Sequence, residues 1–387
     1  MWINPLNMVR RTKEQVNNMP AVCLNCKHPY PEEGAPYCCP KCGGLFDMIQ
    51  PLNFDPAQVD KTQPGIWRYR HTFGLPESVA PVSLGEGATP LTWAKVPSPK
   101  RAWTSRKVAF KAEYHNPTGS FKDRGSSPLV TFLRSRGVTE AVEDSSGNAG
   151  ASFAAYAAQA GIKTGVYVPA TASAFKLERI QSYGAQLHPI AGSRSDVSTA
   201  VKKAADAGVA YASHAYLPFN IPGYATAAYE IYEQLGAAPT AVITPAGQGG
   251  LFLGLVRGFD ALKRAGLIAS VPSIVGVQAR ACAPLWVMST VGFSGMGFVT
   301  EGQTLAEGVR VRYPLRAGEI RQVVEAGHGS FISVEEHDIP RGRDELARRG
   351  LYVESTSAIV WAALEETLQH FTDPLVVMLT GAASKSA

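Results

Sequence analysis

Long hydrophobic runs, low-complexity tracts and regular repeats are all missing from this sequence of 387 residues. No stretch approaches the roughly 20 apolar residues that a membrane-spanning helix needs, so we expect no membrane association. The first residues also lack the apolar core of a secretory signal peptide. We therefore expect a cytoplasmic protein, in which thiols stay reduced and disulfides do not form.

Clusters of basic residues are scarce as well, although the formal net charge is +5. Lysine and arginine are scattered, and no basic run is interleaved with aromatic residues, so we expect small anionic ligands and no nucleic acid. The densest basic segment, residues 341–350, also contains acidic residues and is typical of the solvated face of a helix. A chain of this length is expected to form two or three domains.

Cysteine is scarce except in one short segment, because five of the six cysteines lie between positions 23 and 42. Cys23 and Cys26 form one C-x-x-C pair, Cys39 and Cys42 form another, and twelve residues separate the two pairs. Four such thiolates can surround one zinc ion at about 2.3 Å in a tetrahedron, which leaves no open position and indicates a structural site. Disulfides and unligated core thiols are the alternatives.

The cysteine pattern therefore predicts a small zinc ribbon within an N-terminal unit of residues 1–50. Such a short segment has almost no core of its own, so bound metal would stabilise its fold. Cys38 is expected to be either a spare thiol beside the cluster or a ligand in place of one of the four. Cys282 lies far away in the sequence and is expected to be a small core residue rather than a nucleophile.

From about residue 108 onward, short runs rich in valine, isoleucine and tyrosine alternate with longer helical patterns. This alternation predicts an α/β fold with parallel sheets covered by helices. Ligands bind such sheets at the carboxyl ends of the strands, so we expect the chemistry in the loops that follow them. The predicted strands are residues 108–113, 141–146, 164–170, 185–190, 241–246, 273–278 and 375–380, and the clearest helices are 151–161, 195–208 and 225–236.

The loop after the first of these strands reads NPTGSFKDRGSS and places Lys122 in the first turn of a helix. A cation is unfavourable at the positive end of the helix dipole, by about 0.3–1 kcal/mol. Positive surroundings and burial would lower the pKa of this amine and make it a competent Schiff-base nucleophile. The alternative is an ordinary exposed lysine.

Two further loops contain groups that can bind anions. Ser145 and Ser146 precede Gly147 at the start of a helix, where main-chain N–H groups form an anion cradle. The alternative is an ordinary helix cap. A glycine cluster at residues 247–250 also opens a helix, and its N–H groups can converge on a phosphate, although many strand-to-helix turns look similar.

Together these motifs resemble the threonine synthase family, within the tryptophan-synthase-β-like class of enzymes that use pyridoxal 5′-phosphate. The segment NPTGSFKDRG, residues 116–125, is similar to the cofactor-lysine motif of that family and is the most specific match. Other motifs, such as SSGNAGAS, PAGQGG and VESTSAIVWAAL, follow in family order between about Leu84 and Lys385. The resemblance implies a two-domain α/β enzyme of fold type II, and zinc ribbons precede some members of the family.

The resemblance also implies roles for individual residues. Lys122 would hold the cofactor as a Schiff base and then move protons between substrate carbons. Asn148 would contact the cofactor's 3-oxygen, and Thr380 would face its pyridine nitrogen. A neutral hydroxyl there makes the ring a weaker electron sink than an aspartate would, which favours elimination and replacement over transamination. The cofactor phosphate would be bound by main-chain N–H groups of Gly247, Gln248, Gly249 and Gly250.

The activity implied is the conversion of O-phospho-L-homoserine and water into L-threonine and phosphate. We expect a large cofactor-binding domain of residues 51–120 and 221–387, and a smaller mobile domain of residues 121–220 that closes over the site. A homodimer fits the resemblance. Candidates to bind the anionic groups of the amino-acid substrate are Thr118, Ser120, Ser145 and Ser146.

Three segments differ from the typical threonine synthase pattern. Leu217 stands where asparagine is common, and Pro222 stands where an acidic residue is common. The C-terminal motif lacks a frequent His-Gly pair, and residues 304–311 resemble deaminase-like relatives. One alternative is another reaction of the same cofactor, either β-replacement on an O-phosphoserine-like substrate, as in cysteate synthases, or deamination of a hydroxy or diamino acid. The other is a non-catalytic or nucleic-acid-binding role that rests on the zinc ribbon, and it leaves Lys122 and the glycine loop unexplained. Candidates to bind a substrate phosphate, or else simply surface arginines, are Arg310, Arg312 and Arg316.

Overall fold

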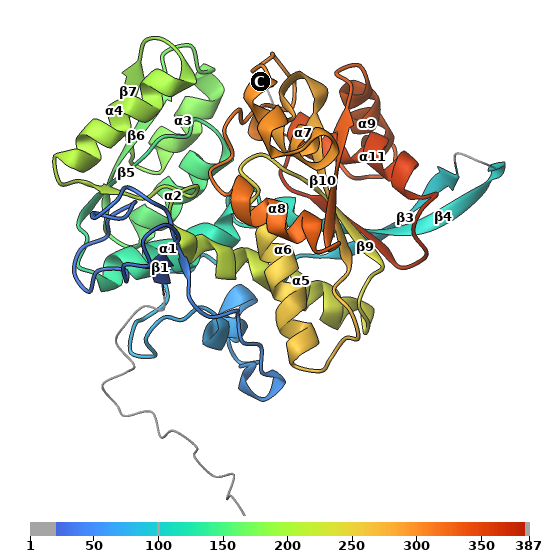
Figure 1. Cartoon of the computed structure of the whole chain (residues 1–387), viewed down its shortest axis with the longest axis horizontal. Coiled ribbons are helices and arrows are strands. Elements are labelled where there is room, and N and C mark those ends of the chain that lie inside the picture. The colour runs from blue at the N-terminus through green and yellow to red at the C-terminus, as the bar shows by residue number, and fades with distance from the viewer. Residues whose placement is uncertain (1–20, 99–100, 384–387) are drawn as a thin grey trace, which may run out of the picture.

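The computed structural model describes residues 21–98 and 101–383. The first twenty residues of the predicted N-terminal unit, and Lys385 at the end of the resemblance, lie outside the described residues. Figure 1 shows a small N-terminal unit, a four-stranded sheet with its helices, and a six-stranded sheet with its helices. Apart from one antiparallel hairpin, the strands of these two sheets are parallel, so the predicted α/β class is confirmed.

The larger sheet has the strand order β11-β10-β9-β12-β4-β3, with the antiparallel β3–β4 hairpin at one edge. Strand β9 is buried at every residue, because helices cover both faces of the sheet, and its sequence is accordingly a nearly continuous apolar run. The strands are β3 (Leu91–Ser98), β4 (Arg101–Ala112), β9 (Ala241–Pro245), β10 (Ser273–Ala279), β11 (Gly329–Val334) and β12 (Leu375–Leu379).

The smaller sheet has the order β7-β6-β5-β8, and every pair in it is parallel. Its strands are β5 (Glu140–Glu143), β6 (Lys163–Pro169), β7 (Gln186–Ile190) and β8 (Ala210–Tyr211). All seven predicted strands lie in the two sheets. The prediction missed β3, which is largely exposed, β8, which has two residues, and β11, in which two serines and a glycine weaken the apolar pattern.

Helices cover both faces of the larger sheet. Helices α5, α6 and α8 pack on one face, and α9, α10 and α11 pack on the other, so alternate residues of each strand contribute to two separate cores. Helices α5 and α6 approach closely at Gly258, where a Cβ would lie 2.6 Å from the carbonyl oxygen of Ala225. The helices are α1 (Lys122–Ser135), α2 (Asn148–Gln159), α3 (Ala174–Ser182), α4 (Arg194–Asp206), α5 (Ile221–Leu235), α6 (Gly250–Arg264), α7 (Pro284–Val291), α8 (Ala317–Glu325), α9 (Asp338–Ala347), α10 (Ser355–Ala358) and α11 (Val360–Thr367).

A buried group of charged residues, which we call the arginine cluster, joins α1 to α5 and to the end of β4. Arg124 Nε lies 2.6 Å from Glu113 Oε2, and Arg124 Nη2 lies 2.7 Å from Glu230 Oε2. Lys111 Nζ lies 2.6 Å from the same Glu230 oxygen. Burial raises the pKa of Glu230, but Arg124 and Lys111 outweigh burial and hold it well below its ordinary value. The cluster fixes the start of α1, and with it Lys122.

The N-terminal unit has one short antiparallel ladder, of β1 (Ala21–Cys23) and β2 (Phe46–Met48). It packs against the body through Tyr30, whose ring meets Phe132 of α1 and Phe219 edge-on, with centroids 5.8 and 5.1 Å apart. Phe219 belongs to the 3-10 helix η5 (Pro218–Asn220). Leu217, just before η5, is fully buried, so an apolar side chain at that departure from the family pattern serves packing.

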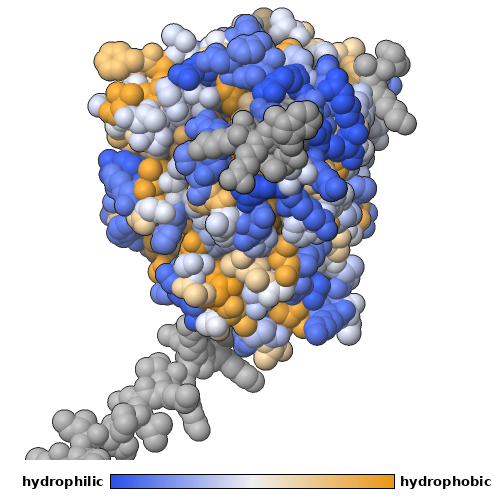
Figure 2. Space-filling view, turned by 90° about the vertical axis from the view of Figure 1, so that its right-hand side faces the viewer, coloured by the Kyte–Doolittle hydropathy of each residue, from blue (hydrophilic) through white to orange (hydrophobic). Residues whose placement is uncertain are grey.

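Figure 2 views the side of the molecule from which the β3–β4 hairpin projects. Hydrophilic side chains dominate the upper part of that face, and apolar ones gather in small groups lower down. On the hairpin, Trp93 is 41% exposed and Lys107 Nζ lies 5.2 Å from its ring centroid. Among the described residues, no helix combines the length and the apolarity that crossing a bilayer demands.

Candidate active site

The loop before α1 is tied to the end of strand β12. Gly119 has a φ of +79°, a left-handed conformation that favours glycine, and its carbonyl accepts the N–H of Ala382 at 2.9 Å. The N–H of Phe121 donates to the carbonyl of Thr380 at 3.0 Å. The start of α1 therefore lies at the carboxyl end of the larger sheet, where ligands bind parallel sheets.

Lys122 is the first residue of α1, as predicted, and it is half-buried. Its Nζ lies 5.0 Å from the centroid of the Phe121 ring. Burial lowers the pKa of Lys122 to about 8, while the carboxylates of Glu143 and Glu354 oppose that shift. An amine with this pKa is neutral in about a tenth of the molecules at pH 7, which makes it a competent nucleophile.

Asn148 is the first residue of α2, which follows β5 in the chain. Its Nδ2 donates to both carboxylate oxygens of Glu354, at 3.0 and 3.1 Å. The N–H of Glu354 donates to the carbonyl of Gly381, so this pair also lies beside the end of β12. Burial raises the pKa of Glu354. Sequence reasoning did not single out Glu354, because a lone glutamate before a short helix carries little signal of its own.

The predicted glycine loop, residues 247–250, connects β9 to α6. Gly249 precedes the first turn of α6 with a φ of +81° and without a side-chain cap. This left-handed φ favours glycine, and a Cβ here would also lie 2.2 Å from Ile320 Cδ1, which would have to move. The first N–H groups of a helix have no intrahelical acceptor, and the loop can therefore bind an anion such as a phosphate. Gln248 Oε1 accepts the N–H of Leu315 at 3.1 Å, which holds the loop in place.

Two buried hydroxyl groups at the same end of the sheet have no hydrogen-bond partner among the described residues: Ser120 Oγ and Thr380 Oγ1. Ser120 is 0% exposed and Thr380 is 3% exposed. Leaving a buried hydroxyl unpaired costs about 1–3 kcal/mol, so both groups have hydrogen-bonding capacity to offer a ligand. Together with the glycine cradle, they fit pyridoxal 5′-phosphate, which carries a phosphate at one end and a ring nitrogen at the other.

The other candidate substrate residues have different surroundings. Thr118 is buried, and both its N–H and its hydroxyl donate to Asp123, each at 2.6 Å, so its hydroxyl is already committed. Ser145 Oγ accepts the N–H of Gly147 at 3.2 Å, and Ser145 and Ser146 are half-buried just before Asn148. The structure therefore places the two serines beside Asn148, whereas the hydroxyl of Thr118 is bonded to Asp123 in the interior.

A cavity of about 10 Å³ lies beside Lys122, which is room for about one water molecule. Its polar lining consists of Lys122, Ser126, Glu143, His214, Asn220 and Tyr224. His214 Nδ1 lies 2.7 Å from Glu143 Oε1, in contact across the ends of β5 and β8. Sequence reasoning missed Glu143, His214 and Asn220, because only the fold brings these separate segments together.

The three arginines considered for a substrate phosphate do not converge on the site. Arg310 forms an ion pair with Glu301 at 3.3 Å, and the guanidinium of Arg312 donates to two main-chain carbonyls. Arg316 is only 3% exposed, and it donates to the carbonyl of Phe46. It is therefore neither a surface residue nor a free cation, since its donors hold the N-terminal unit against the body.

Helix α3 supplies cations that the sequence pattern did not indicate. Arg179 Nη2 lies 3.9 Å from the position that a Cβ would take at Gly119, beside the loop that carries Lys122. The positive charges of Arg179 and Lys176 act to lower the pKa of Glu354, although burial outweighs them. An anionic group of a substrate at this edge would meet favourable charge.

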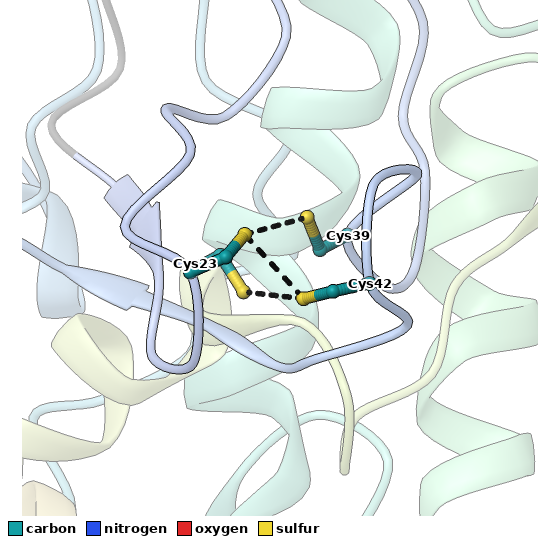
Figure 3. Close-up of side chains that lie close together, drawn as sticks. Cys23, Cys39 and Cys42 are labelled. Carbon is teal, nitrogen blue, oxygen red and sulfur yellow. Dashed lines mark hydrogen bonds between the residues drawn. The ribbon is translucent and has the colours of Figure 1, made fainter.

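The four predicted zinc ligands come together in the N-terminal unit. The sulfur atoms of Cys23, Cys26, Cys39 and Cys42 all lie within 4.8 Å of one another. The Sγ–Sγ distances are 3.5 Å for Cys23–Cys42, 3.6 Å for Cys26–Cys39 and 3.4 Å for Cys26–Cys42. Figure 3 shows Cys23, Cys39 and Cys42 pointing toward one another. A tetrahedron with metal–sulfur distances of about 2.3 Å has edges of about 3.8 Å, so the arrangement fits zinc.

The remaining two cysteines behave as predicted. Cys38 lies outside the group of four sulfur atoms that can share a metal ion. Cys282 is completely buried, and burial raises the pKa of its thiol, which agrees with a core residue. Neither residue belongs to the site around Lys122.

Residues 82–381 match the family described as pyridoxal-phosphate dependent enzyme. The chain belongs to this family, and its cofactor is accordingly pyridoxal 5′-phosphate. Solved structures share the fold: maize serine racemase has a TM-score of 0.64 at 21% identity, covering 77% of this chain and 90% of that chain. Threonine deaminase isoform 2 from Solanum lycopersicum has a TM-score of 0.65 at 19% identity, covering 87% and 93%.

Within that class, several curated relatives are threonine synthases. The protein from Methanosarcina acetivorans is 30% identical over 350 residues, which cover 89% of this chain and 85% of that protein. The protein from Methanocaldococcus jannaschii is 30% identical over 356 residues, covering 90% and 87%. The protein from Mycobacterium bovis is 33% identical over 317 residues, covering 81% and 85%.

Proposed function

We propose that this enzyme is a threonine synthase, which converts O-phospho-L-homoserine and water into L-threonine and phosphate. The main observation is a lysine with a pKa of about 8, placed where the ends of strands, a glycine cradle and unpaired buried hydroxyls meet. The similarity to threonine synthases over nearly the whole chain supports the choice of reaction. The cations on α3 suit a substrate that carries a phosphate.

Residues of this chain would hold the cofactor at its two ends. Gly247, Gln248, Gly249 and Gly250 would bind its phosphate through N–H groups, Asn148 its 3-oxygen and Thr380 its ring nitrogen. Lys122 would bind it covalently through Nζ. When bound, the cofactor supplies an electron sink for negative charge on the substrate carbons. A neutral Thr380 hydroxyl, rather than a carboxylate, keeps that sink moderate, as elimination and replacement require.

The amine of Lys122, once released by the substrate, would accept and return protons at Cα and Cβ. Ser145 and Ser146 are proposed to bind the substrate carboxylate at the start of α2, where N–H groups point toward an anion. Within the described part of the chain the Ser120 hydroxyl has no partner, so it can make a further contact, and Arg179 is placed to meet the substrate phosphate. Thr118 is less suited to this role, because its hydroxyl is occupied by Asp123.

The purified enzyme loaded with cofactor should release phosphate and L-threonine in equal amounts from O-phospho-L-homoserine alone. Lys122→Ala should abolish both products. Lys163→Ala is a matched control, since that lysine is 69% exposed at its side chain and lies on the edge of β6. If wild type releases no phosphate while its absorbance still shows bound cofactor, the threonine synthase assignment is wrong, and O-phosphoserine with added nucleophiles and hydroxy amino acids become the next substrates.

We also propose that Cys23, Cys26, Cys39 and Cys42 bind one structural zinc ion. The converging sulfur atoms support it, and so does the packing, since the buried apolar side chains of residues 21–50 share one cluster with those of α1 and α2. Metal analysis of the purified protein should find about one zinc per chain. Cys39→Ser should lose the metal, whereas Cys38→Ser, at the adjacent position outside the cluster, should retain it. Equal zinc content in the two variants would contradict this assignment.

The domain organisation and the homodimer remain proposals. We propose a large domain of residues 51–120 and 221–387 and a smaller one of residues 121–220. Because the arginine cluster ties α1 to the larger part, we expect the movement in the smaller sheet rather than in α1. The resemblance supports a homodimer, and sedimentation of the enzyme would reveal its mass in solution.

A further inference from the structure

The cavity beside Lys122 contains an acid–base pair that the roles above do not use. Glu143 ends β5 with its side chain 1% exposed, and His214 follows β8 with its side chain 21% exposed. His214 Nδ1 and Glu143 Oε1 are 2.7 Å apart. A carboxylate only accepts hydrogen bonds, so Nδ1 carries the hydrogen, and Nε2 of the neutral ring remains an acceptor.

Both members of this pair are held firmly. The second oxygen of Glu143 accepts the N–H of Ser145 at 2.5 Å, and Asn220 Nδ2 donates to the carbonyl of His214 at 2.6 Å. The neighbouring Asp144 pairs instead with Arg194 of α4 at 2.6 Å. Of the two adjacent carboxylates at the end of β5, Asp144 therefore pairs with an arginine, and Glu143 pairs with the histidine at the cavity.

The cavity also contains an unused acceptor. Asn220 is 1% exposed, and its Oδ1 has no hydrogen-bond partner among residues 21–98 and 101–383. The space of about 10 Å³ suits one water molecule, which needs two to four polar partners. Asn220, His214, Tyr224 and Lys122 line the space, and their polar groups can supply these partners.

We propose that this cavity binds the water molecule that adds to the substrate, and that His214, oriented by Glu143, is the general base that activates it. This inference rests on the proposed function, in which water is the second substrate. His214 is then a catalytic residue, and Glu143 and Asn220 are positioning residues. Activation by such a base contributes about 100- to 10,000-fold to a rate.

The step balances as follows in atoms and electrons. One O–H bond of water breaks, its oxygen forms a bond to Cβ, and its proton goes to Nε2 of His214. The electron pair displaced from the Cα–Cβ double bond takes a proton at Cα from the Lys122 amine. His214 then returns this proton to solvent, which balances the proton that the departing phosphate has taken up, and no oxidant or further reactant is needed.

The test separates elimination of phosphate from addition of water. In wild type, threonine and phosphate should form in a ratio of one. In His214→Gln, phosphate release should fall less than about 10-fold, while threonine should fall about 100-fold. If water does not add at Cβ, the unsaturated amino acid is released from the enzyme and is hydrolysed in solution to 2-oxobutanoate and ammonium. The amount of 2-oxobutanoate should therefore equal the phosphate released minus the threonine formed. Glu143→Gln should shift the products in the same direction, and less strongly.

His188→Gln is the matched control, because His188 lies on β7 and stacks on Tyr167 with ring centroids 4.6 Å apart, outside the cavity. It should keep the ratio at one. Equal losses of phosphate and threonine in His214→Gln, with the ratio unchanged, would overturn the role of His214 while leaving threonine synthase activity in place. No phosphate from wild type would instead overturn the proposed function.

A second readout does not depend on turnover. NMR of protein labelled with ¹⁵N-histidine should show a ring protonated at Nδ1 that is missing in His214→Gln and altered in Glu143→Gln. If His214 instead carries its hydrogen only at Nε2, that nitrogen cannot accept a proton from water, and the proposal is wrong.

Discussion

Two buried groups of charged side chains lie close to Lys122, and they differ in how completely they are paired. In the arginine cluster, Arg124 and Lys111 direct their donors to Glu113, Glu230 and neighbouring oxygens. In the cavity, Asn220 Oδ1 has no partner among the described residues. A saturated network stabilises one conformation, whereas an open one retains hydrogen bonds for a ligand. We therefore assign a structural role to the arginine cluster and a role in catalysis to the cavity group.

The largest effect should come from breaking the saturated group. Arg124→Met leaves Glu113 and Glu230 buried with too little positive charge, and removal of one partner of a buried ion pair costs about 3–5 kcal/mol. Unfolding in urea measures this loss. Arg343→Met is the control, because Arg343 is exposed on α9 and its contact with Asp344 is 3.9 Å long. If Arg124→Met lowers the free energy of unfolding by less than about 1 kcal/mol, the arginine cluster does not have the structural role that its complete pairing implies.

A second prediction uses the pKa of Lys122. Cofactor attachment needs the neutral amine, so the rate at which the apoenzyme binds pyridoxal 5′-phosphate should rise with pH and level off above about pH 8. Because the folded pKa is below that of a free lysine, apoenzyme stability should also increase from about pH 8 to 10.5. Stopped-flow absorbance between pH 6 and 10 measures the midpoint. Glu354→Gln should lower it, since that carboxylate raises the pKa, and a midpoint above pH 10 would refute the argument.

The smallest effect should come from the unpaired hydroxyls. Thr380→Val removes a buried hydroxyl without a partner among the described residues and keeps its shape, so the apoenzyme should become more stable by about 1 kcal/mol, the lower end of the cost of an unpaired hydroxyl. The same change should weaken cofactor binding about 5- to 10-fold, because one hydrogen bond is lost. Melting temperatures and cofactor titrations provide the two numbers. A destabilised apoenzyme with unchanged affinity for the cofactor would show that Thr380 has a structural role and does not contact the cofactor.

Local patterns predicted the parts of this molecule that depend on neighbours in the chain. The alternation of apolar runs and helices indicated the parallel sheets, and the two C-x-x-C pairs indicated the sulfur cluster. Lys122 stood out because it opens a helix after a strand. Strand β8 escaped detection, since two residues carry too little periodicity to count.

The cavity residues could not be found in this way. Glu143 and His214 are 71 positions apart, and each alone is compatible with an ordinary solvated side chain. The same applies to Glu354 and Asn148, which are 206 positions apart. Their importance comes from burial and pairing, and both are properties of the folded chain.

By itself, the sequence determined the α/β architecture, the cofactor lysine motif, the glycine loop and the cysteine pairs, because each depends on spacing within one segment. Only the tertiary structure decided which carboxylates surround Lys122, which hydroxyls stay unpaired, and that Arg316 fastens the N-terminal unit to the body. The physical reason is that charge and hydrogen-bond capacity acquire their energies from burial and from partners distant in the chain.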